Sequence, residues 1–340
     1  MLKNLSFKEK VAFVANIVVA TLLVFAFFIS YQDTNLFSFF AIVHLLVPLL
    51  VILNVLFFCF WLIKRKKQFI PSFLVLAMGY FVFGSFYKIG NSLPEEAHDL
   101  SIMSYNVMGF NRFGWIEGTD IGDQITSFIK AQDPDVLCIQ EHSRIRYQQL
   151  TQYAYRSETP YSSPRSNQAI FSKYPIVASG SLDLPQSGNN IIFADLLFNE
   201  DTLRVYNVHL ESFNIVPNSE TLSNGQSEKT YNRMINTFEK QLQQAKYLKE
   251  HISKTSHKIL ICGDFNNTQF SNVYRLVKNG YHDSFLEAGS GFGKTYDLKG
   301  LPVRIDYILT DDSFEVIKHT NFKERLSDHY PVMATLKIKP

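Results

Sequence analysis

The distribution of apolar and polar residues divides the chain into two unlike parts. The apolar run Leu36–Ile63 exceeds the roughly 20 helical residues needed to cross a bilayer, and the apolar runs Val11–Ser30 and Phe69–Tyr87 about reach that length. Only Asp33 is charged between positions 11 and 63, and no charge lies between positions 68 and 87. The pattern predicts three transmembrane helices, at about residues 11–30, 38–63 and 69–87, within a membrane anchor formed by residues 1–90.

The basic residues indicate how these helices are oriented. Lys3, Lys8 and Lys10 precede the first run, and Lys64–Lys67 separates the second run from the third. Basic loops favour the cytoplasmic side, which predicts a cytoplasmic N-terminus and, after three crossings of the inner (cell) membrane, an extracytoplasmic or periplasmic location for everything beyond Tyr87. The first run is longer than the apolar segment of a signal peptide and further apolar runs follow it, so we interpret it as a retained helix.

Beyond a polar linker at residues 91–98, the pattern changes to alternating strands and helices. The predicted strands are Leu100–Val107, Asp135–Gln140, Pro175–Leu184, Asn189–Phe198, Thr202–Leu210, Lys258–Cys262, Val303–Thr310, Phe314–Thr320 and Val332–Ile338, and the predicted helices run from Ile121 to Ile129, from Ile235 to Ile252 and from Asn272 to Lys278. Strand pairs mixed with helices predict two packed sheets with helices outside them, a layered α/β domain over residues 99–340.

Charge and cysteine content refine this division. The first 98 residues carry eight Lys or Arg and four Asp or Glu, a net charge of +4, whereas the remaining 242 carry 25 and 27, a net charge of −2. A slightly acidic domain is not built to coat nucleic acid by bulk electrostatics, although a local phosphate site is still compatible with it. Cys59 lies in a membrane run, and Cys138 and Cys262 lie in separate apolar strands, so we predict no disulfide.

Polar side chains recur where the predicted strands end or begin. They are Asn106, Glu141, His209, Asp264, Asn266, Asp306, Asp328 and His329. Each alone has an ordinary structural interpretation, such as a turn former, but α/β proteins place ligand sites at strand ends, and this favours one common site. Carboxylate and amide oxygens suit Mg²⁺, with Mn²⁺ as the alternative ion and Zn²⁺ less suited, while histidines suit proton transfer or phosphate binding. The residue types therefore predict metal-assisted phosphoester hydrolysis.

Six motifs in order carry a resemblance to a known family. They are Tyr105-Asn106-Val107, Ile139-Gln140-Glu141, Asn207-Val208-His209-Leu210, Gly263-Asp264-Phe265-Asn266, Arg304-Ile305-Asp306-Tyr307 and Ser327-Asp328-His329-Tyr330-Pro331. Across about residues 99–340 the chain resembles the endonuclease/exonuclease/phosphatase superfamily of DNase-like metal-dependent phosphoesterases. The resemblance implies a four-layer α/β sandwich, in which two packed mixed sheets are flanked by helices and the site lies at one rim of the sheets.

The resemblance also implies a role for each residue around the metal and the attacking water. Glu141, assisted by Asn106, holds the catalytic Mg²⁺, and Asp328 lies beside the metal. Asp264 orients or deprotonates the attacking water, and Asn266 holds the phosphate.

Two histidines complete the implied site. His329 contacts the scissile phosphate and is oriented by Asp306, and His209 acts on the leaving-group or phosphate side. A histidine at position 209 resembles the DNase-like, sphingomyelinase-like and phosphoinositide-phosphatase-like members and argues against a dedicated abasic-site enzyme. The chain departs from the family at Asn167 and Gln168, where relatives usually carry glycine before the Ala-Ile step, and the departure concerns the substrate groove.

Three functions are compatible with these features. The leading hypothesis is a membrane-tethered Mg²⁺-dependent phosphodiester hydrolase, with nucleic acid as one candidate substrate. The alternative is a phospholipid-headgroup or sphingomyelinase-like phosphodiesterase or phosphatase, and a catalytically inactive membrane scaffold is the third. The expected partners are the lipid bilayer and a phosphoester substrate, with no obligate protein partner.

The polar stretch Glu211–Asn232 is either a substrate lid or a disordered insertion.

Overall fold

The chain separates into two compact units in this computed structural model, which describes residues 5–32, 40, 43–84, 86–90, 99–213, 227–298 and 301–339. One unit contains Met1–Phe86, Ile215–Leu242 and Thr268–Arg275. The other contains Tyr87–Asn214, Gln243–Asn267 and Leu276–Pro340. The predicted linker at 91–98 and residues 214–226 of the polar stretch lie outside the described residues.

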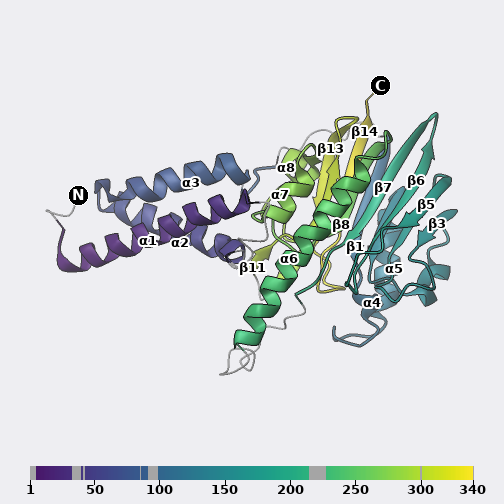
Figure 1. The fold of residues 1–340 in the computed structure, drawn as a ribbon, viewed down its shortest axis with the longest axis horizontal. Helices are drawn as coiled ribbons and strands as arrows, with labels where there is room; N and C mark the ends of the chain where they lie inside the picture. The colour runs from purple at the N-terminus through teal and green to yellow at the C-terminus, as the bar shows by residue number, and fades with distance from the viewer. Residues whose placement is uncertain are drawn as a thin grey trace. The chain divides into compact units, whose positions relative to one another are not determined.

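Apolar helices form the N-terminal part of the first unit. They are α1 (Phe7–Ser30), α2 (Val43–Ile63) and α3 (Ile70–Phe83), which lie side by side in Figure 1. Among the described residues, α1 and α2 are long and apolar enough to cross a membrane, whereas the apolar helical stretch Lys67–Val82 is shorter. These helices are consistent with a membrane anchor.

The prediction of three full-length spanning helices is wrong at the third. Helix α3 has 14 residues, which corresponds to about 21 Å of helix against a hydrocarbon core of about 30 Å. The apolar run in the sequence begins at Phe69, before α3, but Phe69 belongs to the short 3₁₀ helix η2 (Lys67–Phe69). The helix ends at Gly84, whose φ of 75° lies in the left-handed region that glycine tolerates and a helix does not use.

Buried polar side chains connect the three apolar helices. The Ser72 hydroxyl in α3 lies 2.6 Å from Asn16 Oδ1 in α1 and 3.1 Å from Asn54 Oδ1 in α2. Asn16 Nδ2 donates to the Gln68 carbonyl at 3.2 Å, and Asn54 Nδ2 donates to the Leu50 carbonyl at 2.9 Å. Interhelical hydrogen bonds of this kind satisfy polar groups that an apolar environment would otherwise leave unpaired.

The second unit is built on two six-stranded mixed sheets (Figure 1). Their strand orders are β13-β14-β1-β2-β4-β3 and β5-β6-β7-β8-β12-β9, and β10 and β11 form a separate pair. The strands are β1 (Leu100–Asn106), β2 (Val136–Gln140), β3 (Tyr155–Glu158), β4 (Ala169–Ser172), β5 (Ile176–Ser181), β6 (Ile191–Phe198), β7 (Asp201–His209), β8 (Lys258–Asp264), β9 (His282–Asp283), β10 (Tyr296–Leu298), β11 (Leu301–Val303), β12 (Asp306–Thr310), β13 (Phe314–Asn321) and β14 (Val332–Ile338).

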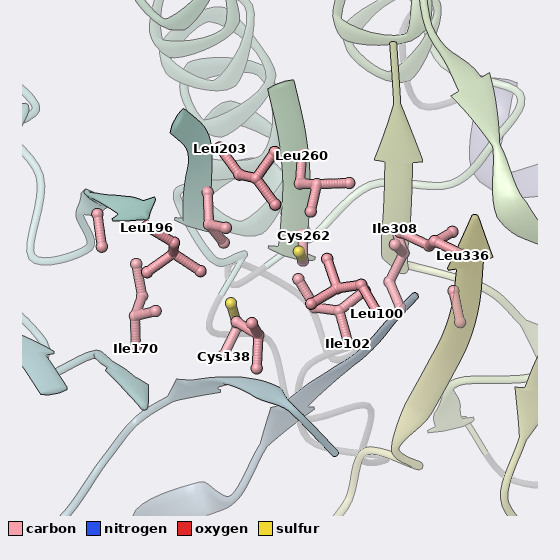
Figure 2. Close-up of a cluster of buried hydrophobic side chains, with 14 of the residues drawn as sticks. Leu100, Ile102, Cys138, Ile170, Leu196, Leu203, Leu260, Cys262, Ile308 and Leu336 are labelled. Atoms are coloured by element: carbon pink, nitrogen blue, oxygen red, sulfur yellow. The ribbon is translucent and has the colours of Figure 1, made fainter. Parts of the chain in front are cut away.

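The main core lies between the two sheets. Leu100 and Ile102 of β1 meet Leu260 of β8 there, as Figure 2 shows. Successive residues of a strand point to opposite faces, and the other face of β1 accordingly packs into a second cluster with the helix that follows. Cys138 and Cys262 are small buried members of the inter-sheet core, and all three cysteines of the chain, each within the described residues, are free.

Helices cover the outer faces of both sheets. Ile125 and Ile129 of α5 (Ile121–Gln132) pack against the first sheet. On the second sheet, the Tyr206 hydroxyl of β7 lies 2.8 Å from His251 Nδ1 of α6 (Ser227–Ile252). The shorter helices of this unit are α4 (Met108–Asn111), η3 (Arg144–Gln149) and α8 (Ser284–Ala288), and α7 (Asn272–Lys278) is divided between the two units. The predicted α/β sandwich is thereby confirmed.

Candidate active site

Strand register aligns three of the predicted site residues in one row. Strands β7 and β8 run parallel and place His209 opposite Asp264. Strand β12 runs antiparallel to β8 and places Asp306 opposite Asp264. Because β12 is antiparallel, its first residue lies at the same rim of the sheet as the last residues of β7 and β8.

The other sheet contributes Asn106 and Glu141. Strands β1 and β2 run parallel with Asn106 opposite Gln140, so Glu141 follows at the neighbouring strand end. Asn106 Nδ2 donates to Glu141 Oε1 at 3.3 Å and to Asp264 Oδ2 at 3.1 Å, which joins the rims of the two sheets. Its Oδ1 accepts the Met108 amide proton at 3.1 Å, and this bond fixes which end of the side-chain amide faces the carboxylates.

His329 is held between two carboxylates. Its Nδ1 lies 3.0 and 3.2 Å from the two oxygens of Asp306, and its Nε2 lies 3.7 Å from Asp264 Oδ2. The loop before β14 is fastened at Ser327, whose hydroxyl donates to the Asn106 carbonyl at 2.8 Å. His329 Nδ1 thus lies within hydrogen-bond distance of Asp306, the residue expected to orient it.

His209 and Asn266 flank Asp264 on the remaining sides. His209 Nε2 lies 3.7 Å from Asp264 Oδ2 and 4.0 Å from Glu141 Oε1. The Asn266 backbone amide donates to Asp264 Oδ1 at 2.8 Å, whereas its side-chain Nδ2 donates to the Leu210 carbonyl at 3.0 Å. The Asn266 amide is near the site, but it is engaged with backbone in this state.

Burial and mutual charge shift the protonation of the site. Burial raises the pKa of Asp264 to about 6, against the opposing effect of His329, and it also raises the pKa of Glu141. Burial lowers the pKa of His209. For His329 burial acts in the same direction, but the Asp306 and Asp264 carboxylates outweigh it and raise the His329 pKa well above its ordinary value. Strongly shifted groups of both kinds within one cluster are typical of active sites.

The donor set fits a hard divalent cation. Oxygen and nitrogen atoms of Asp264, Asp306 and His329 lie within 4.8 Å of one another, and Glu141 is joined to this cluster through Asn106. After burial and the opposing effects of His329 and Asn106, the charge of the half-buried Asp328 contributes to the raised Glu141 pKa. Carboxylates crowded in this way around one histidine of raised pKa form an oxygen-rich, net negative site of the type that binds Mg²⁺ or Mn²⁺.

Sequence reasoning missed two residues beside His329. The Tyr296 ring lies 4.9 Å from the His329 ring, centroid to centroid, and burial, with Asp328 next, raises the pKa of Tyr296 to about 12. The Thr295 hydroxyl accepts the backbone amides of Ile305 and Asp306 at 2.9 and 3.0 Å and so positions the start of β12. The sequence pattern did not indicate either residue, because Tyr296 begins a strand of only three residues, β10, and Thr295 directly precedes it.

A buried amide network lies beneath the site and accounts for one departure from the family pattern. Gln140 Nε2 donates to Asn207 Oδ1 at 2.7 Å, and Gln168 Nε2 donates to the Asn207 carbonyl at 2.9 Å. Asn207 Nδ2 in turn donates to the Ile139 and Ala169 carbonyls of the other sheet. Gln168 is therefore a fully buried link between sheets and not part of the substrate groove.

A cavity of about 370 Å³ opens beside Glu141. Its lining residues come from the loop after β1, the loop after β2 and the segment before β4, and they are Met108, Gly109, Arg112, Phe113, Trp115, Glu141, His142, Ser143, Arg144, Ser166 and Asn167. Asn167, the other departure from the family pattern, thus lines this cavity.

Two family models match different parts of the chain. A family model described as the Endonuclease/Exonuclease/phosphatase family matches residues 103–329, and one described as a domain of unknown function (DUF8431) matches residues 9–86. A search among curated proteins found no match.

Solved structures share the fold of the second unit. Humanized D. rerio TDP2 has a TM-score of 0.54 and 18% identity, over 70% of this chain and 98% of that chain. D. rerio TDP2 complexed with a single strand DNA product has a TM-score of 0.52 and 19% identity, over 70% and 98%. An endonuclease/exonuclease/phosphatase family protein from Bacteroides thetaiotaomicron has a TM-score of 0.52 and 19% identity, over 70% and 97%.

Proposed function

Since the chain belongs to the endonuclease/exonuclease/phosphatase family, whose members are typically phosphoester hydrolases, we propose that it is a divalent-metal-dependent phosphodiester hydrolase. One observation carries the proposal: the row of His209, Asp264 and Asp306 on one sheet is joined through Asn106 to Glu141 on the other. The arrangement brings Asp264, the candidate base, and Glu141, the candidate metal ligand, to one rim. His329, the candidate cation for phosphate, lies there against Asp306 and Asp264.

Mg²⁺ is the proposed ion, with Mn²⁺ as the alternative. Glu141 would hold it, with Asp328 beside it, and Asn106 would keep the Glu141 carboxylate in place through the bond of 3.3 Å. When bound, such an ion stabilises negative charge that develops on the phosphoryl oxygens. A cation there would also offset the crowding of carboxylates that raises the Glu141 pKa together with burial.

Asp264 is the proposed general base. Both of its oxygens are held, Oδ2 by Asn106 Nδ2 and Oδ1 by the Asn266 amide, so the carboxylate has a fixed direction. A pKa of about 6, raised by burial, gives a carboxylate that is ionised near neutral pH yet more basic than an exposed one. Asp264 would accept the proton that the attacking water loses.

His329 is the proposed phosphate-binding cation. Asp306 accepts the proton on Nδ1, which leaves the proton on Nε2 free to be donated to a non-bridging phosphate oxygen. His209 would act on the leaving-group or phosphate side. Asn266 would bind phosphate only after its side chain exchanges the Leu210 carbonyl, 3.0 Å away, for the substrate.

The test is turnover by the full-length chain in detergent micelles. With Mg²⁺ it should cleave a generic phosphodiester such as bis-p-nitrophenyl phosphate, EDTA should stop the reaction, and added Mg²⁺ or Mn²⁺ should restore it. Plasmid DNA, single-stranded oligonucleotides, and sphingomyelin or phosphatidylinositol liposomes complete the substrate panel. No metal-dependent turnover on any of these phosphoesters would contradict the proposal.

Two substitutions test the assigned roles. We expect His329→Ala and Asp264→Asn each to lower kcat at least about a hundredfold, because each removes a proton acceptor or donor that acts only in the transition state. Asp312→Asn is the matched control, since the Asp312 side chain is 94% exposed, pairs with His282, and follows the end of β12 opposite to Asp306. Circular dichroism checks that the variants fold. Wild-type turnover by Asp264→Asn would remove Asp264 from the mechanism.

We further propose that the apolar helices tether the enzyme to a membrane. Two helices of suitable length and hydropathy, Phe7–Ser30 and Val43–Ile63, support the tether. Sedimentation with the membrane fraction, and release by detergent but not by high salt or alkaline carbonate, would distinguish an integral tether from a peripheral association.

A further inference from the structure

Two exposed aromatic rings border the cavity beside Glu141. The Phe113 and Trp115 side chains are 68% and 65% exposed. Their ring centroids lie 5.3 Å apart with 29° between the planes, so the two rings stack on each other, and each side chain stays largely exposed for contact with a further ring. Large aromatic side chains usually bury most of their area, and an exposed stacked pair on the wall of a polar cavity indicates a surface for a planar ligand.

The loop that carries these rings is closed by its own hydrogen bonds. Asn111 Nδ2 donates to the Ile116 carbonyl at 2.9 Å, and the Ile116 amide donates to Asn111 Oδ1 at 3.0 Å. Ile116 also packs against the apolar cluster under the first sheet. The paired bonds and the packed residue hold both ends of the segment that contains Phe113 and Trp115, so the rings are positioned before any ligand arrives.

The remaining lining of the cavity supplies positive charge and hydrogen-bonding groups. The Arg112 guanidinium lies 5.7 Å from the Phe113 ring centroid, and Arg144 lines the cavity from the loop after β2. Ser143 and Asn167 add a hydroxyl and an amide. Arg112 lies beside the stacked rings, whereas Arg144 is paired with Glu158 at 3.2 Å and lies over the Tyr161 ring, 4.0 Å from its centroid. An arginine beside stacked aromatic rings is a combination by which proteins bind single-stranded nucleic acid, because bases stack on the rings and the guanidinium group attracts phosphates.

We propose that this cavity binds an unpaired nucleobase next to the phosphodiester that is cleaved, so that the substrate class is single-stranded nucleic acid. The inference rests on the proposed function, because Glu141 both lines the cavity and belongs to the proposed metal site. A volume of about 370 Å³ lies within the range of pockets that enclose small ligands. A phospholipid headgroup has no planar ring to place between Phe113, Trp115 and the arginines, whereas every base has one.

Trp115 gives a direct optical test in the full-length chain. The chain contains two tryptophans, and the other, Trp61, is fully buried in α2. In detergent micelles with EDTA, so that no cleavage occurs, a single-stranded oligonucleotide should quench Trp115 emission saturably. Trp115→Phe supplies the constant Trp61 background. An oligonucleotide of equal length made of abasic sites should bind more weakly and cause little quenching.

Binding of a fluorescent oligonucleotide, followed by anisotropy, measures the contribution of the ring. Trp115→Ala should weaken binding about 5- to 150-fold, since base stacking contributes about 1–3 kcal/mol, and Trp115→Phe should retain most of the affinity. Tyr155→Ala is the matched control, because Tyr155 is also exposed (40%) but does not line the cavity, and it should bind like the wild type.

Three results would overturn the proposal. They are equal affinity for normal and abasic oligonucleotides, no loss on Trp115→Ala, and saturable quenching by a soluble short-chain phospholipid without quenching by the oligonucleotide. Because binding is measured without metal, the outcome is separable from catalysis. Turnover of bis-p-nitrophenyl phosphate without base-dependent binding would contradict this inference alone, whereas base-dependent binding without any turnover would contradict the proposed function alone.

Discussion

Gly263 sets the spacing between the two strands that carry His209 and Asp264. Its φ is 138°, and a Cβ at this position would lie 2.0 Å from the Val208 carbonyl oxygen of β7. Side chains essentially never approach backbone this closely, so any other residue forces β8 away from β7. Glycine precedes Asp264 in this motif because only glycine lets Asp264 pair in register with His209. The sequence alone did not reveal this requirement.

We predict that Gly263→Ala lowers the free energy of unfolding by about 2–4 kcal/mol and kcat by at least about tenfold. The stability is lost because the strands must separate or the backbone must distort, and the activity is lost because the row of site residues shifts. Thermal unfolding and turnover measure the two effects. Gly188→Ala is the matched control, since an added Cβ there meets no atom within 4 Å, and equal behaviour of the two variants would contradict the argument.

His319 makes stability depend on pH. Burial lowers its pKa from 6.5 to about 4, and Ser284 Oγ lies 2.8 Å from its Nδ1. The folded-state pKa is below the unfolded value, so between pH 6.5 and about 4 the unfolded chain binds the proton more readily. The stabilising contribution is complete above pH 6.5 and is lost as the pH falls toward about 4.

We therefore predict that His319→Gln reduces the acid sensitivity of the α/β unit. Between pH 7.5 and 4.5 the wild type should lose roughly 2–3 kcal/mol more unfolding free energy than the variant does. Urea unfolding followed by far-UV circular dichroism at the two pH values measures this difference, and the comparison at pH 7.5 accounts for the lost contact with Ser284. Parallel pH dependences would show that His319 is not the group responsible.

Among the packed apolar helices, Ser72 links all three. Its hydroxyl lies within hydrogen-bond distance of Asn16 Oδ1 and Asn54 Oδ1. We predict that Ser72→Ala destabilises the helical unit by about 0.5–2 kcal/mol, the range measured for interhelical hydrogen bonds in membranes. Unfolding in sodium dodecyl sulfate measures it. Ser30→Ala is the control, because the Ser30 hydroxyl bonds only the Phe27 carbonyl of its own helix at 2.7 Å, and an equal loss for both would contradict a linking role.

The elements that the sequence predicted well are those with a strong local pattern. The strands that became β1, β2 and β8 are nearly continuous apolar runs, and α5 has an apolar face. Strands β3 and β4 were not predicted, since each is four residues long and the pairing of distant segments defines it. The third apolar helix was predicted too long because an apolar run does not show where Gly84 ends the helical backbone.

For the candidate site, the sequence predicted the residues but not their contacts. Residues at strand ends, such as His209 and Asp264, are recognisable because strand ends converge at one rim. The contacts of these residues could not be predicted from the sequence. They are the register with Asp306, the amide bridge of Asn106 and the ring contact of Tyr296, and each depends on pairing between segments far apart in the sequence. Their roles in catalysis stay predictions until the substitutions are measured.

Whether the short third helix crosses the membrane decides on which side of it the proposed enzyme works. The basic segment Lys64–Lys67 and the N-terminal lysines favour the cytoplasm, so two crossings return the chain inside and a third takes it outside. Helix α3 packs along α1 and α2, because Val75 belongs to the same buried cluster as Leu23 and Val47. If α1 and α2 span the bilayer, α3 shares their apolar surroundings, and a third crossing would require the bilayer to thin around its 14 residues.

The expected extracytoplasmic location of the catalytic unit therefore depends on whether α3 crosses in addition to α1 and α2, and fusions test it. Alkaline phosphatase, which is active only outside the cytoplasm, should be active when fused after residue 340 and inactive when fused after Lys67 within the basic segment. Green fluorescent protein at the same two positions should show the reverse pattern. A C-terminal fusion with inactive phosphatase and bright fluorescence, in a protein that still fractionates with membranes, would mean that α3 does not cross. The catalytic unit would then meet cytoplasmic phosphoesters, because the number of crossings alone sets the compartment from which the substrate comes.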